Sequence, residues 1–381
     1  MPGELLPAAT FAGDWRKLGV AIFVAVILVQ EEVVVHLCRL LVFAVSFLVC
    51  SRALSQKFIN PVPLKKSVKA GVSACVSRSL TKVPMITWGG DMTTIHANGN
   101  QAATDSGSIL GKKGLNLKLV RQDNFKTQLE EYLRCDSPYL RGTLAMINMA
   151  AEAAAADPRT ELKVIYQMTW SAGGDAMVVK GNITKPRDLK GKTIVLQAYG
   201  PHIDYLGKLL SDAGLSTKDV TIKWVADLTG TDNSPMNAFY KKNIDAAMVI
   251  LPDALALTSG GKVGTGAEAS VKGARILLST KSANRIIADV YAVRSDYLKA
   301  QKAQVAKFVQ GLMEAEAETR RLFKGKKQNA KQGLLKASAK MLLDSPQATA
   351  DAEGLFLDAE PVGWAGNKRF FANPKYPRRF E

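Results

Sequence analysis

The chain has 381 residues, more than one hydrophobic core usually supports, so two lobes or domains are expected. Hydrophobic residues make up 47% and charged residues 22%, a balance that excludes a largely disordered chain. The formal net charge is +17, and all of it falls after residue 55, because residues 1–55 contain four basic and four acidic residues. Such an excess suits an anionic ligand, acidic lipid or nucleic acid, and equally a solvated surface without a partner.

The first 55 residues have the parts of an export signal. Two apolar runs cover residues 18–29 and 40–50, and a basic residue, Arg39, precedes the second. Small residues follow at Ala53 and Ser55, as at a signal-peptide cleavage site. Each run is shorter than the roughly 20 residues of a membrane span, and a single anchor over 18–50 would enclose charged side chains. Export with cleavage near Ser55 is therefore favoured over retention of residues 18–50 as an anchor.

Residues 56–82 have the composition of a basic linker rather than a domain. They contain six basic residues, no acidic residue, and prolines at Pro61 and Pro63. Of the four cysteines, Cys75 and Cys135 lie beyond the export segment. These two could pair in an oxidising compartment, but nothing in the sequence places them together, so unpaired thiols are the simpler expectation.

From Val83 onward, short apolar strands alternate with helical patterns. Strands are expected at residues 83–88, 115–120, 162–168, 176–180, 191–196, 220–225, 245–251, 274–278 and 288–293. Helices are expected over 93–112, 125–134, 150–156, 202–213, 237–242 and 296–323, with helical character continuing to about residue 343. Alternation at this spacing predicts βαβ units around parallel sheets.

Enzyme, metal and nucleic-acid motifs are missing or incomplete. The chain has three histidines, no G-x-S-x-G motif and no H-E-x-x-H motif. The segments 107–113 and 191–193 each match only part of a phosphate-binding loop, so both are interpreted as turns. Residues 320–340 hold eight basic residues and no acidic residue. A nucleic-acid patch is the alternative there, but no recognised nucleic-acid motif accompanies the charge, so a solvated helix face is predicted. No cofactor, metal or nucleic-acid partner is expected.

Five segments carry a resemblance to a known family. They are Val83–Gly90, Asp188–Ile194 with the letters D-L-K-G-K-T-I, Gln197–His202, Ile244–Asp253, and a late segment at Pro361–Phe371. In this order they resemble the nitrate/taurine/sulfonate-type solute-binding proteins of ABC importers, which share a fold with thiamine-pyrimidine-precursor synthases. Similar proteins usually continue past the last residue of this chain, which leaves open whether a C-terminal piece is missing.

The resemblance implies a two-lobed α/β fold, the type II periplasmic binding protein fold, with Rossmann-like lobes joined by a hinge. Lobe one is expected to comprise residues 83–180 and 286–381, and lobe two residues 181–285, with crossovers near 178–180 and 288–293. The implied protein is an exported periplasmic or extracytoplasmic receptor, expected to be a monomer, that captures a small organic molecule and delivers it to an ABC permease without catalysis.

Two alternatives to a transport receptor stay open. One is an enzyme similar to the pyrimidine-precursor synthases, whose cysteine-rich iron motif this sequence lacks. The other is a ligand-sensing domain without a transporter. A DNA-binding regulator would need a helix-turn-helix at the N-terminus, where the apolar region lies instead.

The ligand site is expected where strands end and helices begin, because helix N-termini there offer unpaired N–H groups. The predicted ligand-binding residues are Trp88, Gly89, Asp91, Trp170, Ser171, Gly173, Tyr199, Gly200, Pro201, His202 and Asp253. The three aromatic side chains would stack on the ligand, with core packing as the alternative for each. An aspartate in the position of Asp253 is more often a helix cap than a ligand contact.

The charge of the ligand is less well defined by the sequence. The helix start at 199–201 and the basic composition favour a small organic anion or an aromatic heterocycle. The predicted loops contain no arginine, however, and Asp91, Asp204 and Asp253 lie in or near them. A cation is therefore the alternative, bound by carboxylates and aromatic faces.

Overall fold

The computed structural model describes residues 56–75, 79–283, 285–325 and 328–380. The expected export segment, 1–55, lies outside the described residues, so its cleavage or retention stays a prediction. Within the described part, no helix is both long and apolar enough to cross a membrane.

The first lobe is built on strands β1–β4, β10 and β11. β1 (Thr81–Met85) and β2 (Leu117–Arg121) pair in parallel. The four-stranded sheet has the order β11 (Ala359–Pro361), β4 (Leu162–Ser171), β10 (Ala288–Arg294) and β3 (Tyr139–Thr143), and all its pairings are antiparallel. All seven residues of β10 are buried, because this strand lies between two others and is covered on both faces.

The second lobe is built on one five-stranded sheet. Its order is β7 (Thr221–Val225), β6 (Thr193–Gln197), β8 (Ala246–Ile250), β5 (Asp175–Val179) and β9 (Arg275–Ser279). β6 runs parallel to β7 and β8, whereas β5 runs antiparallel to β8 and β9. β5, which the sequence placed in lobe one, thus belongs to lobe two. The first crossover lies between Ser171 and Asp175 rather than at 178–180, because β5 pairs with β8 and β9 and so begins the second lobe.

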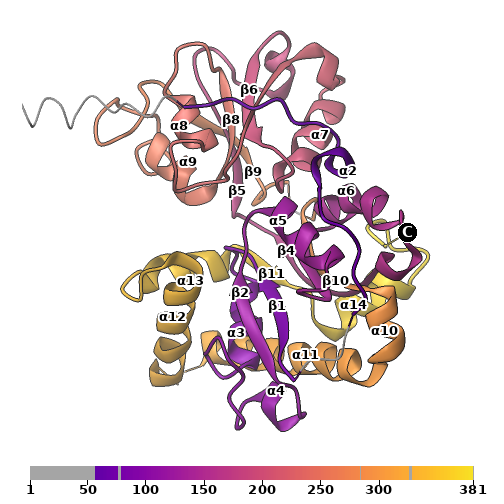
Figure 1. The fold of residues 1–381 in the computed structure, drawn as a ribbon. Coiled ribbons are helices and arrows are strands. Elements are labelled where there is room, and N and C mark those ends of the chain that lie inside the picture. Colours follow the sequence, from indigo (N-terminus) through magenta and orange to yellow (C-terminus); the bar gives the residue numbers. More distant parts are fainter. Residues whose placement is uncertain (1–55, 76–78, 284, 326–327, 381) are drawn as a thin grey trace, which may run out of the picture. The chain divides into compact units, whose positions relative to one another are not determined.

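Helices flank these sheets (Figure 1). In the first lobe they are α2 (Leu64–Ser67), α3 (Asp91–Ala97), α4 (Ile109–Lys112), α5 (Phe125–Leu133), α6 (Leu144–Ala154), α10 (Ser295–Ala300), α11 (Lys302–Lys324), α12 (Gln328–Leu343), α13 (Thr349–Leu357) and α14 (Gly363–Ala372). In the second lobe they are α7 (His202–Asp212), α8 (Pro235–Phe239) and α9 (Leu251–Leu257). Short 3-10 turns occur at Pro158–Thr160, Pro186–Leu189 and Thr217–Asp219.

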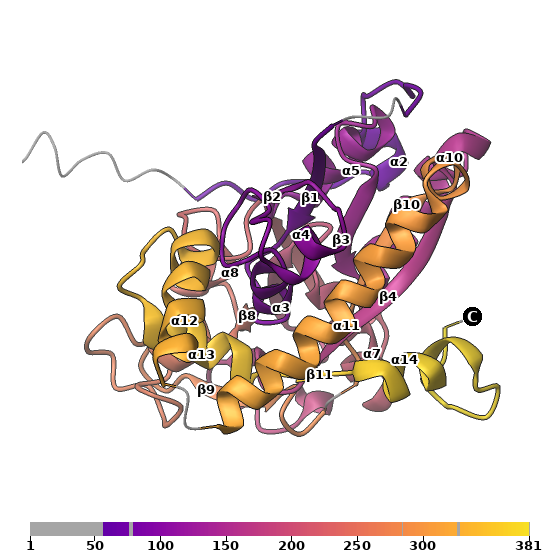
Figure 2. The ribbon, with the colours of Figure 1, turned by 90° about the horizontal axis from the view of Figure 1, so that it is seen from below.

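Two of the expected helices are interrupted. The helix expected over 93–112 is two helices, α3 and α4, separated by a loop. The Asn98 side chain begins that loop by donating to the carbonyls of Gln101 and Ala102, and Gly99 follows with a φ of 88°. The helix expected over 296–323 breaks at Gln301, where φ is −123°, and α11 alone forms the long helix seen in Figure 2.

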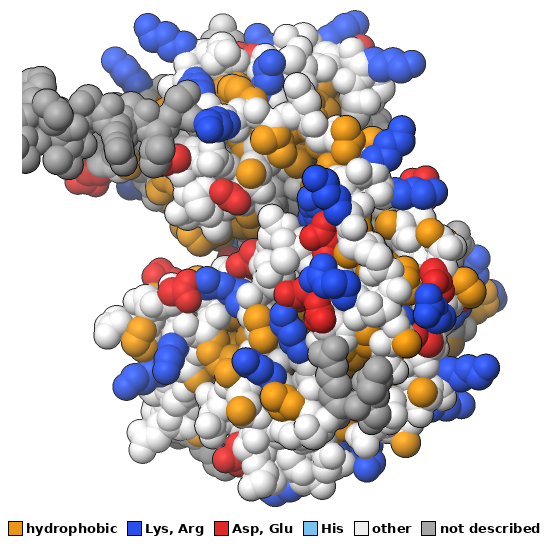
Figure 3. Space-filling model, viewed as in Figure 1, with side chains coloured by type: hydrophobic (Ala, Val, Ile, Leu, Met, Phe, Trp, Pro, Cys, Tyr) orange, Lys and Arg blue, Asp and Glu red, His pale blue; other side chains and the backbone are white. Residues whose placement is uncertain are grey.

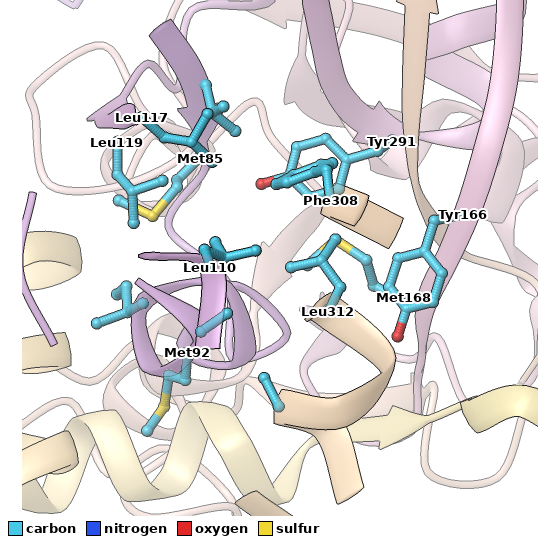
Figure 4. Packing of buried hydrophobic residues seen from close by; sticks show 14 of the residues in the cluster. Met85, Met92, Leu110, Leu117, Leu119, Tyr166, Met168, Tyr291, Phe308 and Leu312 are labelled. Atoms are coloured by element: carbon cyan, nitrogen blue, oxygen red, sulfur yellow. The ribbon is translucent and has the colours of Figure 1, made fainter. Parts of the chain in front are cut away.

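The largest core joins the paired strands of the first lobe to α11. Leu117 and Leu119 of β2 point inward while Lys118 between them is exposed, the alternation expected of a half-buried strand. Phe308 of α11 packs its ring at 77° against Tyr291 of β10, with centroids 5.4 Å apart. Figure 4 shows these side chains converging between the strands and α11. This core packs β1, β2, β4 and β10 against α11.

Residues 56–75, here called the strap, contact both lobes. Ile59 donates its backbone N–H to the carbonyl of Trp224 in β7, and Leu64 is buried against α6. Figure 1 shows the strap in indigo, running from α8 past α7 to α2. At its end Cys75 forms a disulfide with Cys135, with the Cα atoms 5.3 Å apart, a usual separation for such a bond. The expectation of unpaired thiols is therefore wrong, and residues 56–75 of the predicted linker pack against both lobes.

Candidate functional site

A buried polar network lies at the first crossover between the lobes. Asp175, at the start of β5, accepts a hydrogen bond from Ser171 Oγ at 2.6 Å through Oδ2. Its other oxygen lies 2.7 Å from His202 Nε2, at the first residue of α7. Thr280 Oγ1 lies 2.7 Å from Ser171 Oγ and accepts from the backbone N–H of Gly173 at 3.0 Å. The fold thus brings together three of the predicted residues, Ser171, Gly173 and His202, around an aspartate that the sequence did not single out.

The order of groups in this network differs from that of a nucleophilic triad. In a triad the imidazole lies between the hydroxyl and the carboxylate, so that it can take the hydroxyl proton. Here Asp175 lies between Ser171 and His202, and all three are buried. The second ring nitrogen of His202, Nδ1, is buried and contacts no partner among the described residues. This arrangement joins the two lobes at the crossover and differs from a Ser–His–Asp triad.

Two further carboxyl groups at the crossover have raised pKa values. Burial raises the pKa of Asp253, near the start of α9, to about 6, although Thr229 donates a hydrogen bond to its Oδ1 at 3.0 Å. Its Oδ2 is buried without a partner among the described residues. Burial, with a smaller contribution from nearby Asp175, raises the pKa of Asp358 to about 6. Asp253 has no capping hydrogen bond, which sets aside the cap expected from the sequence.

The residues predicted after the first strand are buried inside the first lobe. Trp88 is 7% exposed and donates from Nε1 to Thr169 Oγ1 at 2.9 Å. Gly89 lies so close to α13 that a β-carbon there would come within 1.9 Å of the Leu355 carbonyl oxygen. Asp91 is fully buried in an ion pair with Arg141. In this conformation the three residues pack inside the lobe, and their role as ligand contacts stays a prediction.

Arg141 connects two buried carboxylates. Its guanidinium donates to Asp91 at 3.2 and 2.8 Å and to Asp289 Oδ1 at 2.9 Å, and all three side chains are essentially inaccessible. Burial raises the pKa of Asp91 to about 7 despite this partner. Sequence reasoning missed Arg141 and Asp289, because they lie on separate strands, β3 and β10. The one signal in the sequence is that each of these apolar strands contains a charged residue, which needs a partner when it is buried.

A cavity of about 160 Å³ lies between the lobes, beside the crossover. The predicted residues Trp170 and Pro201 line it, as does the start of α6 at Leu144. Arg285 also lines it, and its guanidinium donates to Glu360 Oε1 at 3.0 Å. Burial raises the pKa of Asp204, the one acidic residue on the lining. The remaining lining residues are Thr143, Ala145, Asn148, Ile286, Ile287, Ala288, Phe370, Arg378 and Arg379.

The cavity adjoins a larger hollow and offers a helix N-terminus. The hollow, of about 480 Å³, shares Leu144, Asn148 and Arg379 with the cavity and is otherwise lined by residues 374–380. α6 spans 11 residues, and Thr143 caps it by accepting from Met146 N–H. The other free N–H groups of its first turn face the start of the helix, where they favour negative charge. Figure 3 shows a further open hollow between the lobes at its left side.

Tyr199 and Gly200 lie at the start of α7, outside this cavity. Tyr199 adopts a left-handed φ of 59°, uncommon for a bulky residue, and its hydroxyl donates to the Val62 carbonyl of the strap at 2.6 Å. It lines a separate, largely apolar cavity of about 450 Å³ together with strap residues and Trp224. Gly200 packs against the Gln197 side chain, with no room for a β-carbon. No group of three or more metal-ligating side chains occurs within the described ranges.

Comparison with known proteins gives one family match and several similar folds. A family model described as NMT1/THI5 like matches residues 111–319. The aliphatic sulphonate-binding protein SsuA of Escherichia coli is 18% identical, with a TM-score of 0.53 over 75% of this chain and 80% of that one. The alkanesulfonate-binding SsuA of Xanthomonas axonopodis pv. citri, bound to MOPS, is 18% identical, with a TM-score of 0.51 over 75% and 86%.

A Candida albicans protein described as having the generic periplasmic binding protein fold is also similar. It is 12% identical, with a TM-score of 0.50 over 74% of this chain and 82% of that one. No curated protein sequence matches the chain. Similarities at this level of identity establish the fold, and they confirm the two-lobed α/β class expected from the sequence.

Proposed function

Because the chain belongs to the NMT1/THI5-like family, we propose that it is an extracytoplasmic solute-binding receptor that delivers its ligand to an ABC permease. The observation that carries the proposal is the cavity between the lobes, whose lining comes from both sides of the crossover. A ligand in such a cavity contacts both lobes, so it binds the closed arrangement best and shifts the open–closed equilibrium.

We propose a small organic anion as the ligand, with a sulfonate or carboxylate group. The α6 N-terminus and Arg285 meet in the cavity, and Trp170 supplies an apolar wall for an aromatic or aliphatic substituent. The 160 Å³ cavity suits the charged group, and the adjoining hollow leaves room for a longer chain. The two SsuA proteins of similar fold bind sulfonates, which agrees with this class.

A binding role also agrees with the chemistry at the crossover. The most reactive combination there, Ser171 with His202, is separated by Asp175. A hydrolase of the Ser–His class has the imidazole in contact with the hydroxyl. The same residues serve a receptor well, because their hydrogen bonds join the end of β4 to β5 and α7 at the point where the lobes meet.

The disulfide supports the proposed location outside the cytoplasm. Cys75 and Cys135 are bonded in the structure, and such bonds persist in oxidising compartments and are rare in the cytosol. Cell fractionation of a tagged chain tests this part of the proposal. A reduced protein found only in the cytoplasm would overturn the receptor function and leave the fold unaffected.

A thermal-shift screen followed by calorimetry tests the ligand. Alkanesulfonates, carboxylates, pyrimidines and polyamines are compared, because a ligand of the folded state raises the melting temperature with its concentration. We expect sulfonates or carboxylates to do so. Arg285→Gln should then weaken binding by about tenfold or more, the usual effect of losing a charge-assisted hydrogen bond.

The matched control is Arg321→Gln, because Arg321 is exposed on α11 and lines none of these cavities. It should leave the affinity unchanged. A shift with polyamines alone would overturn the anionic ligand and keep the receptor. Equal affinities for Arg285→Gln and wild type would show that the ligand binds elsewhere, such as the open hollow in Figure 3.

A further inference from the structure

α14 presents an aromatic and basic face to solvent. Trp364 is 69% exposed and Phe371 is 38% exposed, and Lys368 between them is also exposed. Spacings of four and three residues place all three on one side of the helix. The helix itself is anchored, because the buried Asn367 bonds to both backbone groups of Gln167 in β4. The orientation of the exposed face is therefore set by the fold.

The chain after α14 folds back and adds charge to this face. Phe380 donates its N–H to the carbonyl of Phe370 at 2.8 Å and packs against the Phe371 ring at 5.9 Å. The turn between them exposes Lys375 and Arg378. Figure 2 shows α14 and this turn in yellow, next to the label that marks the C-terminal end. The basic side chains thus project from an ordered loop next to the aromatic face.

The charged side chains of this segment are all basic. Residues 361–380 contain five basic residues and no acidic residue. In the part of the chain that the structure describes, no ion pair involves Lys368, Arg369, Lys375 or Arg378. We call Trp364, Lys368, Arg369, Phe371, Lys375 and Arg378 the α14 surface. Exposed aromatic rings beside unpaired cations are the combination that binds at the interface of an anionic bilayer.

The other basic stretch of the chain lacks this combination. On α11 and α12, Arg320 pairs with Glu316 and Lys331 pairs with Glu353. Phe323, the aromatic residue of that stretch, stacks on Phe356 with ring centroids 3.8 Å apart. The α14 surface therefore differs from the basic stretch on α11 and α12 in its exposed aromatic rings and not only in its charge.

We propose that the α14 surface binds anionic phospholipid headgroups, with Trp364 and Phe371 seated at the level of the headgroups. Lys368 contacts the phosphates directly, whereas Arg369, on the adjoining side of the helix, and the turn at 375–378 add long-range attraction. Docking of this kind would hold the protein at a membrane surface while its lobes remain free to open. The partner recognised here is a lipid surface, a different ligand from the solute between the lobes, although Lys375 and Arg378 also line the two cavities described above.

Co-sedimentation of the full chain with vesicles tests the proposal. Vesicles of phosphatidylcholine are compared with vesicles that also contain phosphatidylglycerol. Residues 1–55 carry equal numbers of basic and acidic residues, so the preference for the anionic vesicles reports on the rest of the chain. We expect preferential binding to the phosphatidylglycerol vesicles that weakens as salt is added.

Variants of the α14 surface then identify the contacts. Lys368→Gln with Arg369→Gln should lower the partition coefficient on anionic vesicles by roughly 25-fold, since each basic residue near such a surface contributes about fivefold. Trp364→Ser should lower it by roughly tenfold on both vesicle types, from lost apolar burial. These side chains are exposed, so the melting temperatures should stay close to that of the wild type.

Matched controls come from elsewhere on the molecule. Lys336→Gln with Lys340→Gln removes the same charge from exposed positions of α12, and Val263→Ser removes an apolar side chain that is 57% exposed in the second lobe. Both should leave the partition coefficient within about twofold of wild type. Equal losses from the two charge pairs, or no preference for phosphatidylglycerol, would overturn the proposal. Crosslinking to a membrane protein that needs the α14 surface, without vesicle binding, would overturn it in favour of an acidic protein partner.

Discussion

Replacing Arg141 by methionine would leave two carboxylates buried without their partner. Asp91 and Asp289 are 0% and 2% exposed, and the guanidinium supplies three of their charge-assisted hydrogen bonds. Removing one member of a buried ionic cluster costs about 3–5 kcal/mol, because the remaining charge is neither paired nor hydrated. We therefore expect Arg141→Met to lower the free energy of unfolding by about 4 kcal/mol at pH 7.

The effect should depend on pH in a defined direction. Burial raises the folded-state pKa of Asp91 to about 7, above its ordinary value of 3.8. The folded protein therefore keeps a proton that the unfolded chain releases, and stability is lost as pH rises from 4 through 7. Without Arg141 the pKa rises further, so the loss continues to higher pH. The difference between Arg141→Met and wild type should widen above pH 7 and shrink towards pH 4.

Urea unfolding followed by tryptophan fluorescence measures both effects. Trp88 is a local reporter, because its indole bonds to Thr169, which in turn donates to Asp289. The triple variant Asp91→Asn, Arg141→Met, Asp289→Asn removes all three charges and should regain most of the lost stability. A loss below about 1 kcal/mol in Arg141→Met, or no recovery in the triple variant, would refute the account of this cluster.

Three further outcomes are expected. Cys75→Ser should destabilise the protein by about 4 kcal/mol in urea under oxidising conditions, because the disulfide closes a loop with a sequence separation of 60; an unchanged midpoint would contradict this. Asp253→Asn should raise the melting temperature at pH 8 and not at pH 4, since the folded-state pKa of about 6 exceeds the ordinary value and its penalty appears only as pH rises through 6. Gly89→Ala should cost about 1–3 kcal/mol by overlap with the Leu355 carbonyl, whereas Gly207→Ala, in open space on α7, should not destabilise; equal effects would disprove the overlap.

Local patterns in the sequence predicted most of the strands and helices, although not α13, β11 or α14. The alternation of Leu117, Lys118 and Leu119 predicts β2, and the apolar run after Ile244 predicts β8, each within a few residues. The helix expected over 93–112 is interrupted because α3 ends at Asn98 and Gly99. These two residues are a turn signal within an otherwise helical pattern.

The candidate site was only partly predictable, because its interactions join distant parts of the chain. Trp170 and Pro201 were chosen for their places at a strand end and a helix start, and both line the cavity between the lobes. Asp91 was chosen by the same reasoning, but its partner Arg141 follows 50 residues later on another strand. The local sequence around a carboxylate does not show whether it faces a ligand from a loop or is paired inside a lobe. The pairing depends on strand order, which local patterns do not reveal.

The strap limits how far the two lobes can part. Ile59 is bonded to β7 of the second lobe, and Leu64 is buried in the first, with only five peptide units between them. A fully extended chain of that length reaches roughly 18 Å, so the strap is a tether of fixed reach beside the two crossovers. Rotations that keep these anchors within that reach leave it intact. A wider swing would have to break the Ile59 pairing or withdraw Leu64 from its apolar site, at roughly 1.5–3 kcal/mol for the leucine alone.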